Sequence, residues 1–569
     1  MPENETLFVP AQDEEYADYI VKYSEFVQGP VGYIEQAISE KRFEIINENY
    51  AVVYSEIQKE APIRITAESY GAIPKYYTYM SLESLNTSGI SRLHNHPYLR
   101  LRGRGTAVAI IDSGIDYEHP AFRNPDGTSR IACLWDQSLP TTKVSEIVPY
   151  GADFTKEQID AALASEEPRQ IVPSYDENGH GTFLAGIAAG NLDEEQDSSG
   201  TAPEATLIVV KLKPMKQYLR ELYLIPEGAE VFQENDIMFG IQYAITCAQM
   251  LGMPLSVCIG LGGSLGSHWG ESPISLFLNN MNRYVGNVSV AAIGNEGNQR
   301  HHYQGRVEPQ QGYAQVELKV GQREGFIMEF WGNSPNPFSM IIESPSGEQK
   351  EIVKSRTLMF QRLAFVFADT VIEASYVPIE RQTGETLIFL RILNPVEGIW
   401  RIQVLSDSCQ GSGFHMWLPV TPLINQETYF LASSPDVTLT TPAVAKDVIS
   451  VTAYNTQNES LYLEASRGYT PNMNIKPDIA APGVDLRGPL PDGRYGVRSG
   501  TSLAAAYTTG AAALLFEWAI VKGNDGAFSG NTVRNYMVRG ARRSRLRQYP
   551  NPEWGYGILD LYHVLELLT

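Results

Sequence analysis

The chain has 569 residues, of which 43% are hydrophobic and 19% charged, and its formal net charge is −22. This length exceeds one ordinary hydrophobic core and predicts roughly two to four domains. The negative charge argues against a nucleic-acid surface, because phosphate binding needs Lys and Arg clusters. The longest basic stretch, GARRSRLR at 540–547, is interpreted as a solvated turn or a salt-bridge site.

The N-terminal stretch MPENETLFVPAQDEEYADYIVKY lacks the basic and apolar regions of a secretory signal peptide. The sequence has no run of about eighteen uncharged apolar residues, so no membrane span is predicted. We therefore expect a protein that stays inside the cell, without a membrane partner. Four widely spaced cysteines, without metal-site spacing, are interpreted as free buried thiols rather than disulfides or nucleophiles: Cys133, Cys247, Cys258 and Cys409.

Residues 1–85 predict a small α+β unit. Its expected elements are a strand in DYIVKY (18–23), a helix in VGYIEQAISEKR (31–42), the segment FEIINENYAVVYSEI (43–57) and a strand in IPKYYTYM (73–80). The β-branched and aromatic runs favour strands, and the apolar spacing of 31–42 favours a helix.

Residues 86–302 and 431–569 predict an α/β fold. Short apolar runs typical of buried parallel strands occur at 106–116, 205–212, 254–261, 288–295 and 446–454. Helical patterns lie between several of them, after residue 182, at 236–251 and at 274–285. This alternation predicts a doubly wound parallel sheet with its ligands at the carboxyl ends of the strands.

Residues 303–430 interrupt this pattern with alternating runs separated by Gly, Pro, Asn and Ser turns. Examples are AQVELKV (314–320), GFIMEFWG (325–332) and TLIFLRIL (386–393). Such alternation indicates an antiparallel β-sandwich inserted into the α/β domain, since α/β segments resume after it. The sequence does not separate a stabilising brace from a partner surface.

Three residues at the ends of predicted elements could form a charge-oriented nucleophile. Asp112 closes the strand AIID, His180 opens a helix between two glycines, and Ser502 opens the apolar helix that follows SGTS. Each has a structural alternative: a turn residue for Asp112, a satisfied histidine for His180 and a helix cap for Ser502. The chain order Asp, His, Ser in these local contexts favours a subtilisin-type triad.

Asn295, in AAIGNEGN (291–298), follows an apolar strand and lies between glycines. Its amide could stabilise an oxyanion together with the backbone N–H of Ser502 at a helix start. The alternative is that Asn295 only tolerates a left-handed turn.

The motifs AIIDSGID, NGHGTFLAGIAAG, AAIGNEGN and SGTSLAAAYTTGAA resemble those of subtilases, the subtilisin-like serine peptidases. The resemblance implies catalytic roles for Asp112, His180 and Ser502 and an oxyanion role for Asn295. GLGG at 260–263 implies a substrate-binding strand with Gly260, Leu261 and Gly262.

By the same resemblance, Glu296 is expected to border the pocket for the residue before the cut, with a leaning towards basic or polar side chains. Many subtilases have a proline where this chain has Ala506. Alanine is a good helix former, so we expect no loss of activity from this departure.

That variant, the insert ending in MWLP and the tail YPNPEWGYGILDL are most similar to the clostridial germination-specific Csp proteases. This resemblance implies a jelly-roll insert, a prodomain that is cut off and stays bound, and a protein substrate such as the zymogen of a spore-cortex hydrolase. It also implies a cytoplasmic or spore-associated location. We expect the prodomain to be cut within 81–96.

No cofactor is expected to be required. Structural calcium is possible at the acidic loop NLDEEQDSSG (191–200), although exposed acids are more often simply solvated. A catalytically silent regulatory scaffold is the alternative to an enzyme. A lipase or esterase is disfavoured, because G-x-S-x-G is absent around Ser502.

Overall fold

The computed structural model describes residues 9–22, 42–57, 63–67, 69–80, 82–83, 101–143, 145–321, 324–333, 336–353, 359–406 and 411–568. The helix expected at 31–42, apart from its last residue, and Cys409 lie outside the described residues, as does most of 81–96. Cys133, Cys247 and Cys258 are free thiols.

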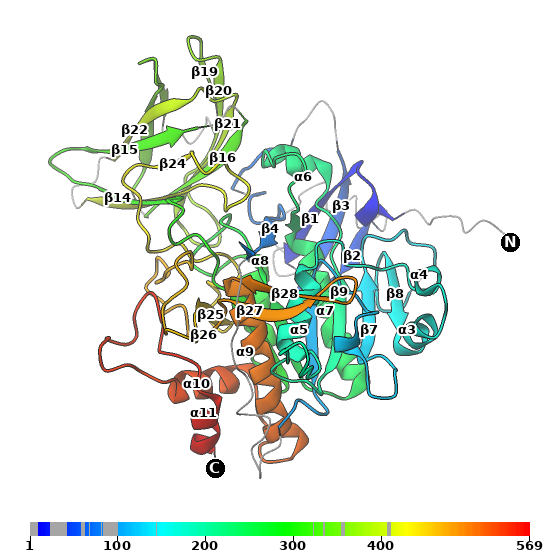
Figure 1. Cartoon of the computed structure of the whole chain (residues 1–569). Helices are drawn as coiled ribbons and strands as arrows, with labels where there is room; N and C mark the ends of the chain where they lie inside the picture. The colour runs from blue at the N-terminus through cyan, green and yellow to red at the C-terminus, as the bar shows by residue number, and fades with distance from the viewer. Residues whose placement is uncertain are drawn as a thin grey trace.

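An eight-stranded sheet forms the centre of the molecule (Figure 1). In sheet order its strands are β26 (Ile479–Pro482), β25 (Ile449–Tyr454), β13 (Asn287–Ala292), β11 (Leu255–Ile259), β6 (Ala107–Asp112), β9 (Thr206–Lys211), β7 (Ile131–Asp136) and β8 (Ala152–Thr155). Neighbouring strands are parallel except for the β7–β8 pair. The predicted doubly wound sheet is confirmed.

Helices pack on both faces of this sheet. Val108 and Ile110 of β6 share a core with helices α5 (His180–Ala189) and α9 (Thr501–Phe516). Ala107, Ala109 and Ile111, which point the other way, share a second core with α7 (Glu234–Leu251) and α8 (Pro273–Met281). Because side chains alternate along a strand, β6 has an apolar run buried on both faces.

The remaining helices of the described chain are short. They are α3 (Lys156–Leu163), α4 (Pro168–Ile171), α6 (Gln217–Leu222), α10 (Gly530–Gly540) and α11 (Leu561–Leu568). The 3₁₀ turns are η1 (Pro10–Gln12) and η2 (Pro120–Phe122), and η3 (Glu517–Val521) is a π-helix.

Helix α9, continued by η3 to Val521, is long and apolar enough to cross a membrane by length and composition. However, 78% of its most apolar window is buried inside the protein. It runs through the core of the α/β part (Figure 1), which accounts for its apolar composition.

Residues 302–430 form two antiparallel sheets that lie beside the central sheet (Figure 1). One sheet contains β14 (His302–Val307), β23 (Ser412–Trp417), β16 (Phe326–Gly332), β21 (Thr386–Leu393), β20 (Thr370–Val377) and β19 (Phe360–Phe365). The other contains β18 (Gln349–Ile352), β17 (Phe338–Glu343), β22 (Gly398–Ser406), β15 (Tyr313–Val320) and β24 (Tyr429–Phe430). Both sheets contribute to one hydrophobic core, as in a sandwich.

The N-terminal part contains a separate sheet of β1 (Tyr16–Lys22), β3 (Tyr50–Glu56) and β2 (Phe43–Ile45). The strand expected at 73–80 does not join it. As β4 (Tyr76–Tyr79), it lies between β10 (Phe232–Gln233) and β12 (Leu261–Gly262) of the α/β part. The alternation of apolar and polar residues predicts a strand but does not say which strand it pairs with, so the sequence could not show this placement.

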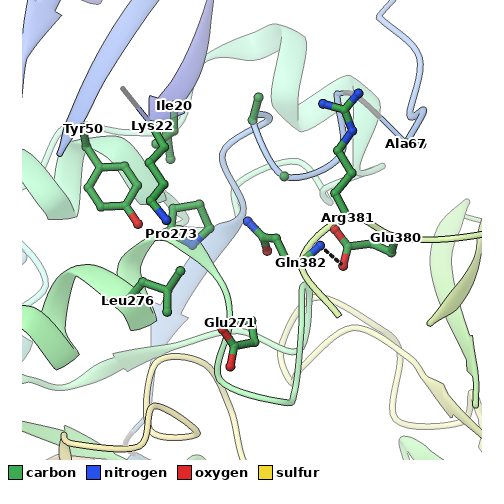
Figure 2. Close-up of a pocket in the computed structure, with 12 residues that line it drawn as sticks. Ile20, Lys22, Tyr50, Ala67, Glu271, Pro273, Leu276, Glu380, Arg381 and Gln382 are labelled. Atoms are coloured by element: carbon green, nitrogen blue, oxygen red, sulfur yellow. Dashed lines mark hydrogen bonds between the residues drawn. The ribbon is translucent and has the colours of Figure 1, made fainter. Parts of the chain in front are cut away.

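A cavity of about 270 Å³ marks the junction of the N-terminal part, the α/β part and the insert (Figure 2). Lys22 and Tyr50 line it from the first, Glu271 from the second and Arg381 from the third. The three parts therefore meet at one place, and contacts there link all of them.

Glu329 of β16 is a buried carboxyl at this junction. It accepts hydrogen bonds from the hydroxyl of Tyr70 at 2.6 Å, the indole of Trp331 at 3.1 Å and the amide of Gly266 at 3.3 Å. Burial raises the pKa of Glu329 to about 7, although the bonds from Tyr70 and Trp331 favour the charged form.

Stability at this junction should therefore depend on pH. A carboxyl whose pKa is higher in the folded than in the unfolded chain stabilises the fold at low pH, and this stability is lost as pH rises from about 4.5 to 7. We expect the free energy of unfolding to fall by about 3 kcal/mol over this range relative to Glu329→Gln, a neutral side chain of the same shape. Denaturant unfolding of both proteins at pH 5 and pH 8 measures this, and parallel pH dependences would contradict it.

Candidate active site

Asp112, His180 and Ser502 meet at the carboxyl ends of the parallel strands, where the sequence placed them. His180 Nδ1 lies 2.7 Å from Asp112 Oδ1, and His180 Nε2 lies 3.2 Å from Ser502 Oγ. All three side chains are buried. Since a carboxylate only accepts hydrogen bonds, Nδ1 carries a proton and Nε2 can accept the proton of Ser502.

The start of helix α5 holds His180 in place. Gly179 precedes it with a φ of +77°, a left-handed conformation that favours glycine. Asp176 accepts hydrogen bonds from the amide of Gly179 at 2.8 Å and from the amide of Thr182 at 2.8 Å. A carboxylate at a helix N-terminus satisfies the free amides and fixes the first turn.

Asn295 lies beside the start of helix α9. Its Oδ1 accepts hydrogen bonds from the amide of Thr501 at 3.3 Å and the hydroxyl of Thr501 at 3.0 Å. A backbone amide can only donate, so Oδ1 is assigned by this contact and the NH₂ group is left to donate. This orientation is compatible with the oxyanion role expected from the sequence.

A segment of the chain itself crosses the site. β4 pairs antiparallel with β12, with Tyr79 opposite Leu261 and Thr78 opposite Gly262. The amide of Met80 donates to the carbonyl of Gly260 at 3.3 Å. The predicted substrate strand Gly260–Leu261–Gly262 therefore binds an extended backbone.

The carbonyl of Met80 lies against the start of helix α9. Its oxygen accepts a hydrogen bond of 3.2 Å from the backbone N–H of Ser502, in the first turn of helix α9. Beyond Met80, β5 (Leu82–Glu83) pairs with β28 (Arg494–Ser499), so the chain continues past the serine in extended form.

Side chains before Met80 are also in contact with the site. The ring of Tyr79 lies 4.7 Å from the ring of His180 and 5.6 Å from that of Phe232. Tyr77 is buried, and the hydroxyl of Thr78 donates to the carbonyl of Glu230 at 2.9 Å. The side chains of Tyr77, Thr78 and Tyr79 are therefore each buried or held by a contact with the α/β part.

Close packing around the serine requires small residues. A Cβ on Gly260 would lie 2.4 Å from Leu184, 3.2 Å from His180 and 3.3 Å from Ser502. Ala506 is fully buried in an unbroken α9, so the departure from the subtilase proline leaves the helix continuous.

Glu296 differs from the expectation of a pocket residue. Its carboxylate is buried, with Oε2 2.6 Å from Nδ1 of His301 and Oε1 accepting the amide of Thr421 at 2.9 Å. A carboxylate with two buried partners is not free to bind a substrate side chain.

The acidic loop 191–200 does not converge on a cation. Asp193 Oδ1 accepts the amide of Gln196, its Oδ2 accepts the hydroxyl of Tyr495, and Glu194 and Glu195 are exposed. Among the described residues, no group of three or more His, Cys, Asp or Glu is arranged to hold a metal ion. These residues do not fit a calcium site.

Sequence reasoning missed several residues of the site: Asp176, Tyr79, Met80, His301 and Thr421. The acid four positions before His180 was visible as a helix-start signal. Tyr79, Met80 and Thr421 come from segments distant in sequence. His301 lies only five residues after Glu296, but no local pattern marks it as a partner.

A Ser, His and Asp in hydrogen-bond contact at the edge of a doubly wound sheet define the class of subtilisin-like serine peptidases. A model of the subtilase family matches residues 103–315 and 425–557. The chain belongs to the subtilase family. The two matched segments are separated by most of the inserted sheets.

Among solved structures, the chain is similar to the CspB protease of Clostridium perfringens, with 31% sequence identity and a TM-score of 0.74 over 84% of this chain and 96% of that one. It is 23% identical over 448 residues to the C5a peptidase of Streptococcus pyogenes, which covers 73% of this chain and 35% of that protein. Thermitase of Thermoactinomyces vulgaris is 25% identical over 201 residues, 35% of this chain and 51% of that protein. The chain spans about a third of the length of the C5a peptidases.

The amide of Asn295 can be tested by Asn295→Leu, which keeps the size of the side chain and removes the donor. We expect the rate of peptide-bond cleavage to fall by about 10² to 10³ with little change in thermal stability. The rate is measured on a peptide that carries the sequence of residues 76–80, Tyr-Tyr-Thr-Tyr-Met. An unchanged rate would exclude Asn295 from oxyanion stabilisation.

Proposed function

We propose that this chain is a serine endopeptidase that cuts its own Met80–Ser81 bond and retains residues up to Met80 in the active site. The observation that carries the proposal is the hydrogen bond from the Ser502 amide to the carbonyl of Met80. It supports a cut just before the segment 81–96 that the sequence favoured.

The residues in contact support a reaction in two halves. Ser502 Oγ attacks the carbonyl carbon of Met80, and its proton moves to Nε2 of His180, whose imidazolium Asp112 stabilises. The oxyanion accepts hydrogen bonds from the Ser502 amide and the Asn295 NH₂ group. The bond to the nitrogen of Ser81 breaks, and His180 gives this amine its proton.

Water then hydrolyses the ester. It attacks the Met80 carbonyl carbon, His180 accepts its proton, and the bond to Ser502 Oγ breaks as the oxygen regains a proton from His180. The products are a carboxylate on Met80 and a free amine on Ser81.

Buried polar contacts support retention of the N-terminal part after this cut. Asp18 of β1 accepts hydrogen bonds from Lys216 at 2.7 Å, Gln233 at 2.7 Å and Asn235 at 3.0 Å. The Asp18 and Lys216 side chains are almost fully buried. Separation would break this network and also the pairing of β4 with β10 and β12.

We propose a protein zymogen, such as a spore-cortex hydrolase, as the substrate cut in another chain, and a cytoplasmic or spore-associated location. The similarity to the CspB protease and the motifs shared with the Csp group support this substrate class. The side chains of Tyr77, Tyr79 and Met80 indicate that aromatic and unbranched apolar residues before the cut bind well.

The cut itself is tested by intact mass and N-terminal sequencing of the purified protein. We expect two co-purifying fragments, one ending at Met80 and one starting at Ser81. Ser502→Ala should give a single chain, because no other group of the site can attack the carbonyl. A single wild-type chain, or a new N-terminus elsewhere, would contradict the proposal.

Recognition of the residue before the cut is tested at Met80. Its side chain is 2% exposed, with Cε close to Gly262. Met80→Asp should slow self-cleavage by about 10- to 100-fold, because a carboxylate would be placed in an apolar pocket. Met80→Leu is the matched control and should cut at nearly the wild-type rate. Equal rates for both variants, followed by gel electrophoresis over time, would show that this pocket does not select the substrate.

A further inference from the structure

We propose that Glu296 and His301 are positioning residues that hold Asn295 in its reactive place and so couple the inserted sheets to the active site. The inference rests on the proposed function, since it concerns the same oxyanion contact. It assigns a task to the insert, for which the sequence left open a brace or a partner surface.

The carboxylate of Glu296 joins two separate segments. Oε2 lies 2.6 Å from Nδ1 of His301, and Oε1 accepts the amide of Thr421 at 2.9 Å. The Glu296 and His301 side chains are 6% and 5% exposed. Hydrogen bonds to a charged group in a buried place are among the stronger ones, and removing one partner leaves the other unsatisfied.

His301 lies just before the first strand of the insert, β14, and Thr421 lies four residues after β23. The carbonyl of His301 accepts the amide of Leu418, the residue after β23. β14 and β23 then pair antiparallel from His302 opposite Trp417 onward. Glu296 therefore binds both chain segments that connect the α/β part to β14 and β23.

The same loop carries Asn295, the residue directly before Glu296. Its backbone is anchored by the amide of Gly294 to Thr501 Oγ1 at 3.2 Å and by the amide of Gly297 to the carbonyl of Glu464 at 2.9 Å. The Glu296 side chain adds the link from this loop to the insert. Oxyanion donors must lie within about 0.5 Å of their productive position, so a loose loop loses rate before it loses fold.

The chain between Glu296 and His301 is also held by the far end of the insert. Arg300 has a φ of +63°, a left-handed conformation that is unfavourable for a non-glycine residue. Its guanidinium lies 3.5 Å from the ring centre of Tyr429, and its carbonyl accepts the amide of Phe430 at 3.1 Å. These contacts keep the segment between Glu296 and His301 in one conformation.

The tautomer of His301 follows from its partner. A carboxylate only accepts, so Nδ1 carries the proton. Nε2 of His301 is buried without a hydrogen-bond partner among the described residues, which suits an unprotonated nitrogen. The nitrogen of an asparagine side chain lies at nearly the same distance from the backbone as Nδ1, so His301→Asn can replace this donor.

The test measures the rate constant of self-cleavage in the full chain after a pulse of cell-free synthesis. Glu296→Ala and His301→Ala should cut about 10- to 100-fold more slowly than wild type, because the donor is displaced. His301→Asn should restore most of the rate. His415→Gln is the matched control. His415 forms a hydrogen bond of 3.0 Å with His302, on the paired strands β23 and β14, and lies outside the loop that carries Asn295. The His415→Gln variant should cut at the wild-type rate.

A double variant separates positioning from general stability. Asn295→Leu combined with His301→Ala should cut no more slowly than Asn295→Leu alone, because His301 acts through Asn295. The inference would be overturned if the rate losses of Asn295→Leu and His301→Ala multiply in the double variant. A wild-type rate for both Glu296→Ala and His301→Ala would overturn it as well. If either alanine variant does not fold, the cleavage rates of His301→Asn and His301→Gln are compared instead, once with Asn295 and once with Asn295→Leu. The two rates should differ only when Asn295 is present. Failure of wild type to cut would instead overturn the proposed function.

Discussion

The hydrogen bond from the Ser502 amide to the Met80 carbonyl is the contact on which the other features depend. It places a carbonyl of the chain beside the serine hydroxyl, at the positive end of helix α9. The pairing of β4 with β12 fixes the direction of this segment, and β5 with β28 continues it past the serine. Helix α9 packs in the core of the α/β part, so the serine and its amide are held by a buried helix.

Electrostatics at the site follows from burial. Asp112 and His180 have little contact with water, so their hydrogen bond acts in a low dielectric and resists exchange with solvent. A second buried pair, Glu296 with His301, lies where the chain enters the insert. One buried pair orients the base and the other, in our proposal, orients the donor. The inserted sheets then belong to the catalytic unit and are more than a brace.

The sequence was sufficient for the central sheet and for the residues that meet there. Uniform apolar runs such as 107–111 predicted strands buried on both faces, and the structure has them. Asp112 ends a strand, Asn295 follows one, and His180 and Ser502 lie at helix starts, so local patterns identified them. Contacts between distant segments were not predictable. Glu296 has a different set of partners than expected because Thr421 comes from the other side of the insert, 125 residues further along the chain. The strand β4 pairs outside the N-terminal sheet because its pairing partner is set by tertiary packing.

Oxygen exchange at the new C-terminus tests the central claim most directly. If the carboxylate of Met80 stays beside Ser502, the serine ester reforms with loss of water and is hydrolysed again, so incubation of the cut protein in H₂¹⁸O should label both carboxylate oxygens. Mass spectrometry of the peptide that ends at Met80 reads this out, with an internal peptide as the control. Labelling of both oxygens is the predicted result. A cut protein whose Met80 carboxylate gains no label would contradict the claim that the cleaved end remains in a working active site.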